Sequence, residues 1–112
     1  MADHNGRYIL DDQGNVMPCP DLLEWGAWFE TAGEKRRVAL DKVGDWTVST
    51  VFLGFDQSWC PDPMADPLNY KPVLWETMAF DCIHNGQMML RYNSREAALT
   101  GHRGIVAIVR EK

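Results

Sequence analysis

Residues 46–53 have the sequence Trp-Thr-Val-Ser-Thr-Val-Phe-Leu, and residues 73–80 have the sequence Val-Leu-Trp-Glu-Thr-Met-Ala-Phe. Both runs are rich in β-branched and aromatic residues, which is typical of β-strands. In the first run, Trp46 and Phe52 share one face and Val51 lies on the other. Because both faces are partly apolar, we expect a central strand here, and we predict that the second run pairs with it antiparallel.

Residues 56–72 connect the two runs and are rich in proline and aspartate. A long loop inside a compact domain is usually functional or disordered, so we predict an exposed loop that recognises a partner. Aromatic residues and methionine are enriched at the centres of protein interfaces. The predicted binding residues are therefore Trp59, Met64, Leu68 and Tyr70. The alternative is that these side chains fold back and cover the edge of the sheet.

The segments before the first run predict a hairpin, a helix and a strand. Residues 8–10 and 16–17 flank a turn that contains glycine, which favours a hairpin. Asp21 can accept hydrogen bonds at the start of a helix, and Gly33 suits its end, so we place this helix at residues 21–32. Residues 36–43 predict a strand that forms a second hairpin with residues 46–53.

The segments after the second run predict a fourth main strand at residues 87–92 and a C-terminal helix. We expect Asn93 to cap this helix, with Glu96 three residues on. Two glycines, Gly101 and Gly104, either weaken the helix or permit a close approach to the sheet. The apolar stripe that should face the sheet consists of Ala98, His102, Ile105 and Val109.

The order of elements is therefore ββαββββα. It predicts an α+β fold with an antiparallel sheet of about four main strands, an N-terminal hairpin and two helices packed on one face of the sheet. The length of 112 residues fits a single domain, with residues 1–6 expected to be disordered. The mixed polarity of the central strands suggests that the second face is partly covered, for which a second copy of the chain is one candidate.

The composition narrows the classes of partner. A net charge of −5 argues against a nucleic-acid-binding surface, which needs clustered basic residues. No stretch reaches the roughly 18 apolar residues of a membrane-spanning helix, and the first residues contain no apolar signal segment. Together with an odd count of 3 cysteines, these features lead us to expect reduced thiols in a cytoplasm.

Glu76 and His102 are the candidates for catalysis. Glu76 lies within a mostly apolar strand, and His102 lies on the apolar stripe of the last helix, so the two could meet as an acid–base pair, with Arg91 or Ser49 assisting. The alternatives are that Glu76 lies on a solvent-facing or edge-protected side, or that it forms an ion pair with Arg91 or Arg95. For His102, the alternative is a structural histidine with satisfied hydrogen bonds.

The sequence gives little support for a metal site, a nucleotide-binding site or a reactive thiol. Asp81, Cys82 and His84 offer three types of ligand, but the paired spacing typical of zinc sites is missing. Cys60 has no basic neighbour that would activate its thiol. There is no glycine-rich phosphate loop. We therefore expect neither a metal nor a cofactor.

Several motifs resemble a family of small proteins from tailed phages and prophages. They include Tyr-Ile-Leu-Asp-Asp-Gln-Gly-Asn at 8–15, Trp-Phe-Glu-Thr-Ala at 28–32, residues 48–56, Trp-Glu-Thr-Met-Ala-Phe at 75–80, and Arg-Tyr-Asn-Ser-Arg-Glu-Ala-Ala at 91–98 followed by Gly101 and His102. The resemblance covers nearly the whole chain. It implies a phage-encoded accessory protein in the bacterial host cytoplasm.

Two hypotheses about function follow. The first is a non-enzymatic protein that binds a host or phage protein through residues 56–72 and the exposed face of the sheet. Its role could be to counteract a host defence system or to moderate phage gene expression or assembly. The second is a small enzyme or ligand-binding protein that uses Glu76 and His102, and it requires these two side chains to share a pocket.

Overall fold

The computed structural model describes residues 6–57 and 71–111. The elements in chain order are β1 (Tyr8–Leu10), β2 (Val16–Pro18), α1 (Leu22–Ala32), a 3₁₀ turn η1 (Gly33–Arg36), β3 (Arg37–Val43), β4 (Trp46–Phe52), β5 (Trp75–Asp81), β6 (Gly86–Tyr92) and α2 (Arg95–Arg110). The predicted α+β class and element order are confirmed. Most of the predicted disordered N-terminus and exposed loop lies outside the described residues.

The main sheet has the strand order β3-β4-β5-β6, and every neighbouring pair is antiparallel. The two runs that predicted the fold are its central strands, with Trp46 opposite Asp81 and Phe52 opposite Trp75. The second strand begins two residues later than predicted and continues through Asp81. Beyond β4 and before β5, the Asp56 carboxylate accepts a hydrogen bond from the Val73 amide (2.9 Å), which holds the two chain segments side by side.

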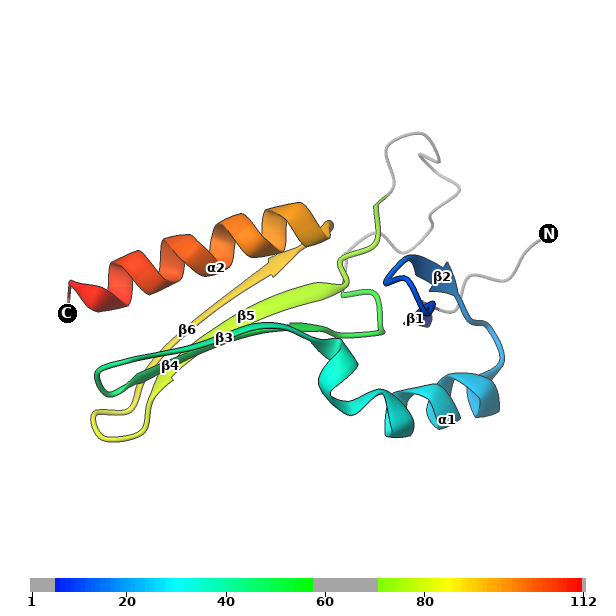
Figure 1. The fold of residues 1–112 in the computed structure, drawn as a ribbon, viewed down its shortest axis with the longest axis horizontal. Coiled ribbons are helices and arrows are strands. Elements are labelled where there is room, and N and C mark those ends of the chain that lie inside the picture. The colour runs from blue at the N-terminus through cyan, green and yellow to red at the C-terminus, as the bar shows by residue number, and fades with distance from the viewer. Residues whose placement is uncertain (1–5, 58–70, 112) are drawn as a thin grey trace.

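Strand alternation gives the sheet two different faces. On the inner face, β4 contributes Val48, Thr50 and Phe52 and β5 contributes Trp75, Thr77 and Ala79, all of them buried. Helix α2 lies along this face (Figure 1). The residues that α2 buries are the predicted stripe of Ala98, His102, Ile105 and Val109. The inner face and α2 therefore form the core.

Helix α1 packs at the end of the sheet, together with the β1–β2 hairpin (Figure 1). The Trp25 indole donates to the carbonyl oxygens of Tyr8 (3.1 Å) and Gly54 (2.9 Å), which joins α1 to β1 and to the segment after β4. Trp28 meets Phe52 edge to face, with ring centroids 6.0 Å apart. Since Phe52 also belongs to the cluster that includes Ala98 of α2, both helices pack against side chains of the inner face.

The helix boundaries follow from side-chain caps. Asp21 accepts from the amides of Leu23 and Glu24, as predicted for α1, and Gly33 at its end has a φ of 47°. The prediction that Asn93 caps α2 is wrong by one residue. Ser94 has the extended backbone of a cap and accepts from the Ala97 amide at 3.1 Å.

The two glycines of α2 have different surroundings. A Cβ atom at Gly101 would overlap the ring and hydroxyl of Tyr92, so this glycine is what lets α2 approach β6. A Cβ atom at Gly104 would meet nothing within 4 Å. The expectation of close approach is therefore confirmed for Gly101 and wrong for Gly104, which only weakens the helix.

This contrast yields a matched pair of substitutions. We expect Gly104→Ala to raise the free energy of unfolding by about 0.5–1 kcal/mol, because alanine restricts the unfolded chain and favours helix. Gly101→Ala should lower it by about 1–3 kcal/mol, because Tyr92 would have to leave its packed position. Denaturant titration of both variants measures the difference. Equal changes in the two variants would contradict the proposed contact between α2 and Tyr92.

Candidate functional site

A chain of hydrogen bonds runs through the core beneath α2. His102 Nε2 lies 2.7 Å from Asp41 Oδ2, and His102 Nδ1 lies 2.7 Å from the Thr50 hydroxyl. Thr50 in turn is bonded to the Thr77 hydroxyl at 2.5 Å. We call these four residues the buried polar chain. It joins α2 to β3, β4 and β5.

The order of donors in this chain is self-consistent. With a neutral imidazole protonated on Nε2, His102 donates to the Asp41 carboxylate and accepts on Nδ1 from the Thr50 hydroxyl. Thr50 can then accept from Thr77. Each ring nitrogen and each hydroxyl in the chain therefore has a partner, as buried polar groups require.

A carboxylate, an imidazole and a hydroxyl in sequence resemble the arrangement that activates a nucleophile. Here, however, Thr50 and Thr77 have no exposed surface, and the side chain of His102 is only 4% exposed. A substrate could not reach these hydroxyls. Among the chain's members only Asp41 reaches solvent, so the geometry supports the structural interpretation of His102.

Glu76 lies on the opposite face of the sheet from His102. It is opposite Val51 of β4 and Arg91 of β6, whereas Thr50 and Thr77 point toward α2. The predicted meeting of Glu76 with His102 is therefore wrong, because strand alternation places them on different sides. Arg91 Nε instead donates to Glu76 Oε2 at 3.0 Å, which confirms the alternative of an ion pair. Ser49 shares the face of Glu76, opposite Met78.

A second polar pair stabilises the turn between β5 and β6. Asp81 Oδ2 lies 2.8 Å from His84 Nδ1, and Asp81 Oδ1 accepts from the amides of Ile83 and His84. The hydrogen bond with His84 lowers the pKa of Asp81, and the same carboxylate raises the pKa of His84. The hydrogen bonds of Asp81 therefore stabilise this turn.

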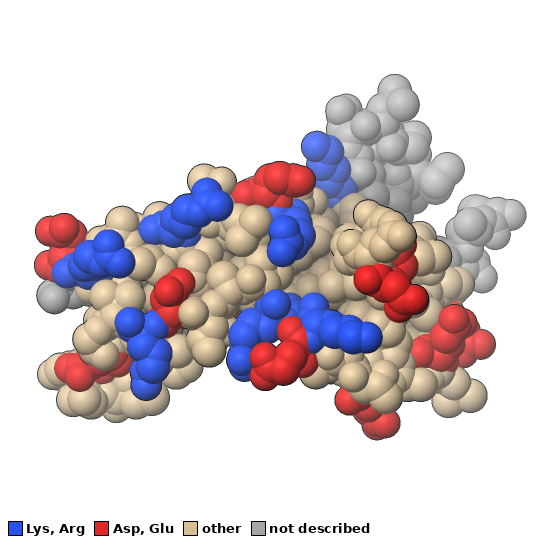
Figure 2. Space-filling model, viewed as in Figure 1, with Lys and Arg blue, Asp and Glu red and all other residues tan. Residues whose placement is uncertain are grey.

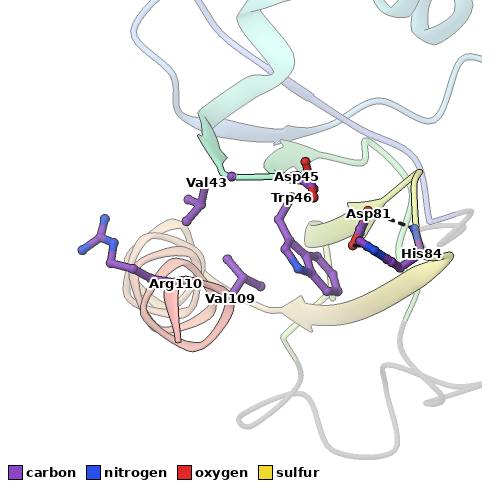
Figure 3. Close-up of a pocket in the computed structure, with 8 residues that line it drawn as sticks. Val43, Asp45, Trp46, Asp81, His84, Val109 and Arg110 are labelled. Carbon is purple, nitrogen blue, oxygen red and sulfur yellow. Dashed lines mark hydrogen bonds and ion pairs between the residues drawn. The ribbon is translucent and has the colours of Figure 1, made fainter. Parts of the chain in front are cut away.

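This pair borders a cavity of about 500 Å³ at the end of the sheet (Figure 3). Val43, Trp46 and Val109 form its apolar part. In Figure 3 Asp81 and His84 point toward each other, while the Arg110 side chain extends away from them. The charged groups do not converge on a common point, so the cavity offers no evident acid–base or anion-binding arrangement.

The last candidates are the metal ligands, the cysteines and the residues of the long loop. Within residues 6–57 and 71–111, no cluster of three His, Cys, Asp or Glu side chains could hold a metal ion. Cys82 is exposed, whereas Cys19 is buried, and burial raises the pKa of its thiol. The predicted binding residues Trp59, Met64, Leu68 and Tyr70, and also Cys60, lie outside the described residues.

The face of the sheet that carries Glu76 is a mixed surface of five apolar and seven polar or charged side chains. We call it the open face, since no helix or strand among the described residues packs on it (Figure 1). One row across the four strands consists of Leu40, Ser49, Met78 and Met89, which lie opposite one another in that order. The other members are Arg37, Lys42, Thr47, Val51, Glu76, Phe80, Gln87 and Arg91.

Charge is distributed unevenly over the molecule. Residues 11–30, which include most of the N-terminal hairpin and α1, contain five acidic residues and no lysine or arginine. In Figure 2 the charged side chains over this end are mainly acidic, while both signs are interspersed over the sheet and α2. The open face carries three basic residues and one acidic residue, in a chain with 11 basic and 16 acidic residues. It is therefore a basic surface on an acidic protein.

Comparison with protein-family models, with curated proteins and with solved structures finds no match. The resemblance to phage proteins therefore stays a hypothesis. No described helix has the length and apolar content needed to cross a membrane.

The hydrogen-bond partners of His102 are not among the residues predicted from the sequence. A signal was present, because Thr50 and Thr77 are polar residues at inward positions of two otherwise apolar strand faces. Asp41 could be found in the same way, as the acidic residue in the predicted strand at 36–43. What the sequence does not give is the register that aligns these residues beneath His102.

The buried polar chain predicts unequal effects for two similar substitutions. Thr50→Val removes the central hydroxyl and leaves both His102 and Thr77 without their partner, so we expect a loss of about 1–3 kcal/mol in unfolding free energy. Thr77→Val leaves the bond between Thr50 and His102 intact and should cost about 1 kcal/mol or less. The double variant should cost less than the sum of the two. Additive effects in denaturant titrations would show that the hydroxyls act independently.

The Asp81–His84 pair predicts a pH dependence. The raised pKa of His84 means that its contribution is present below the ordinary value of 6.5 and is lost as pH rises through the folded-state pKa. The lowered pKa of Asp81 means that its contribution is present above 3.8 and is lost as pH falls through its folded-state pKa. The pair should therefore stabilise the fold most between these two values.

This expectation can be measured with His84→Asn. The loss of unfolding free energy caused by this variant should be larger at about pH 5.5 than at about pH 8.5. Its size should be small, because the His84 side chain is largely exposed. A loss that is the same at both pH values would mean that the imidazolium form contributes nothing to stability.

Proposed function

We propose that this chain is a non-enzymatic binding protein and that the open face contacts another protein. The observation that carries the proposal is a four-stranded sheet with α2 on one face and, among the described residues, no element packed on the other. Leu40 and Met89 on this face are 46% and 45% exposed. They lie on the two edge strands, at opposite ends of the row that also contains Ser49 and Met78. An apolar surface that is left uncovered is typical of protein interaction sites.

The placement of the polar groups favours binding over catalysis. The only described imidazole with two side-chain partners, His102, is enclosed between α2 and the sheet. Glu76 lies on the open face but is already paired with Arg91. Neither side chain can reach the other, so the acid–base pair that the enzymatic hypothesis requires is missing.

The charges of the open face favour a partner of particular chemistry. Arg37, Lys42 and Arg91 lie on either side of the row that contains Leu40, Met78 and Met89, with Glu76 as the single carboxylate of this face. Arg37 pairs with Glu34 and Arg91 pairs with Glu76, while no ion pair is seen for Lys42 within the described part of the chain. The surface therefore fits a protein patch with an apolar centre and an acidic rim.

The resemblance to phage proteins supports a narrower version of this proposal. In this version the partner is a host or phage protein in the bacterial cytoplasm, and binding counteracts a host defence system or moderates phage gene expression or assembly. Residues 56–72 lie between β4 and β5 in the sequence, and in this proposal Trp59, Met64, Leu68 and Tyr70 take part in the contact.

Two matched double variants test the proposal. Leu40→Ser with Lys42→Glu removes an apolar and a basic group from the open face. Arg103→Glu with Ile108→Ser makes a similar chemical change on α2. Ile108 is 48% exposed, and this exposed fraction is close to that of Leu40. Capture by a tagged chain from a host lysate should survive the second change and be lost with the first, because only the first alters the proposed interface.

The captured protein can then be purified and titrated at increasing ionic strength. We expect affinity to fall with salt, since the proposed rim contacts are between opposite charges. Melting temperatures of both variants provide the control for folding. Capture that survives the change on the open face, or capture lost equally in both variants, would contradict the proposed surface. A folded bait that captures nothing would count against the binding function itself.

A further inference from the structure

The outer edge of β6 is an unusual feature of this sheet. Strand β6 pairs with β5 on one side, and no strand within residues 6–57 and 71–111 pairs with its other side. An edge strand presents unpaired backbone donors and acceptors, and proteins normally protect such edges with charges, prolines or bulges. Strand β6 has seven residues, none of them proline, and Arg91 is its only charged residue.

The opposite edge of the same sheet is protected. Strand β3 has an irregular register between Arg37 and Ala39, which interrupts its regular geometry. It also carries three charged residues, Arg37, Asp41 and Lys42, in the same length of seven. Of the two edge strands of this sheet, only β3 therefore carries features that hinder pairing with another strand.

Strand β6 also exposes apolar side chains on both of its faces. Met89, on the open face, is 45% exposed, and Leu90, on the face toward α2, is 49% exposed. Helix α2 reaches the far strand β3 through His102 and Asp41, so it leaves the outer part of β6 uncovered. A strand added at this edge would bring neighbouring side chains to both faces at once.

We infer that the outer edge of β6 pairs antiparallel with β6 of a second copy of this chain. In an antiparallel pair, directly opposite residues point to the same face of the sheet. The twofold axis therefore passes between two copies of the same residue, because any other position would place opposite residues on different faces. The register that pairs all seven residues places Met89 on the axis. Gln87 then lies opposite Arg91 of the second copy, and Met88 lies opposite Leu90 of the second copy.

This register is self-complementary in charge. The two Arg91 side chains are each opposite a glutamine, whose side-chain oxygen can accept a hydrogen bond from arginine, and no like charges face each other. No acidic residue lies in β6, so the pairing brings together the strands of two acidic chains without opposing their carboxylates.

The dimer has a defined arrangement. Its axis is perpendicular to the sheet, so the two α2 helices lie on the same side and the two open faces join into one continuous eight-stranded surface. The row Leu40–Ser49–Met78–Met89 of each copy ends at Met89 and continues into the same row of the other copy. The pairing uses an edge and leaves the open face accessible, so it can be tested separately from the proposed partner binding.

Cysteine cross-linking tests the register directly. In a background with Cys60→Ser and Cys82→Ser, Met89→Cys places two thiols on the twofold axis, where Cβ atoms about 4.5–5.5 Å apart can form a disulfide with small adjustments. Leu40→Cys is the matched control, because Leu40 lies on the other edge strand, faces the same side and is almost equally exposed. Under mild oxidation, the monomer band should disappear for Met89→Cys and persist for Leu40→Cys.

The mass of the unmodified chain in solution provides the second measurement. Light scattering over a range of concentrations should give twice the mass of one chain. Met89→Lys should give the mass of one chain, because two lysines would meet beside the axis, while Leu40→Lys should remain a dimer. A cooperative melting transition of Met89→Lys shows that the monomeric variant is folded. A monomeric unmodified chain, a dimer that Met89→Lys leaves intact, or equal cross-linking of both cysteine variants would overturn the inference.

Discussion

The position of α2 depends on the buried polar chain from Asp41 through His102 and Thr50 to Thr77. Apolar contacts alone would let a helix slide or rotate over a sheet, because burial is not directional. Hydrogen bonds from one imidazole to two different strands permit a single arrangement. The inner face of the two central strands is buried as a result, and the opposite face is the one on which no described element packs.

The same arrangement encloses the residues that resemble a catalytic set. A histidine with two partners is often the centre of an active site, but here α2 covers its hydroxyl partners completely. Glu76 and Arg91 on the other face form an ion pair with each other, and Asp81 and His84 at the β5–β6 turn stabilise a loop. The candidate residues His102, Glu76 and Asp81 therefore have structural roles. The open face carries apolar and basic side chains on which no described element packs.

Much of the fold could be predicted from local patterns. The helix after Asp21, the β1–β2 hairpin, the paired central strands and the stripe on α2 all depend on residues close together in the chain. The site could not be predicted in the same way. His102 bonds to residues 52 and 61 positions away, and which residues meet there depends on strand register and on the angle at which α2 crosses the sheet. Alternation within β5 predicts that Glu76 and Thr77 point to opposite faces of the sheet. Which of these faces α2 covers depends on tertiary packing.

The connection between β4 and β5 has a consequence for how the protein folds. Strands β3 and β4, and likewise β5 and β6, are joined by short turns, so each pair can form early as a local hairpin. Joining the two hairpins requires closure of the long segment between Phe52 and Trp75, and its entropy cost precedes any contact across the central pair. We therefore expect the seam between β4 and β5 to form in the rate-limiting step. Helix α2 would dock afterwards, because His102 needs both hairpins before its hydrogen bonds exist.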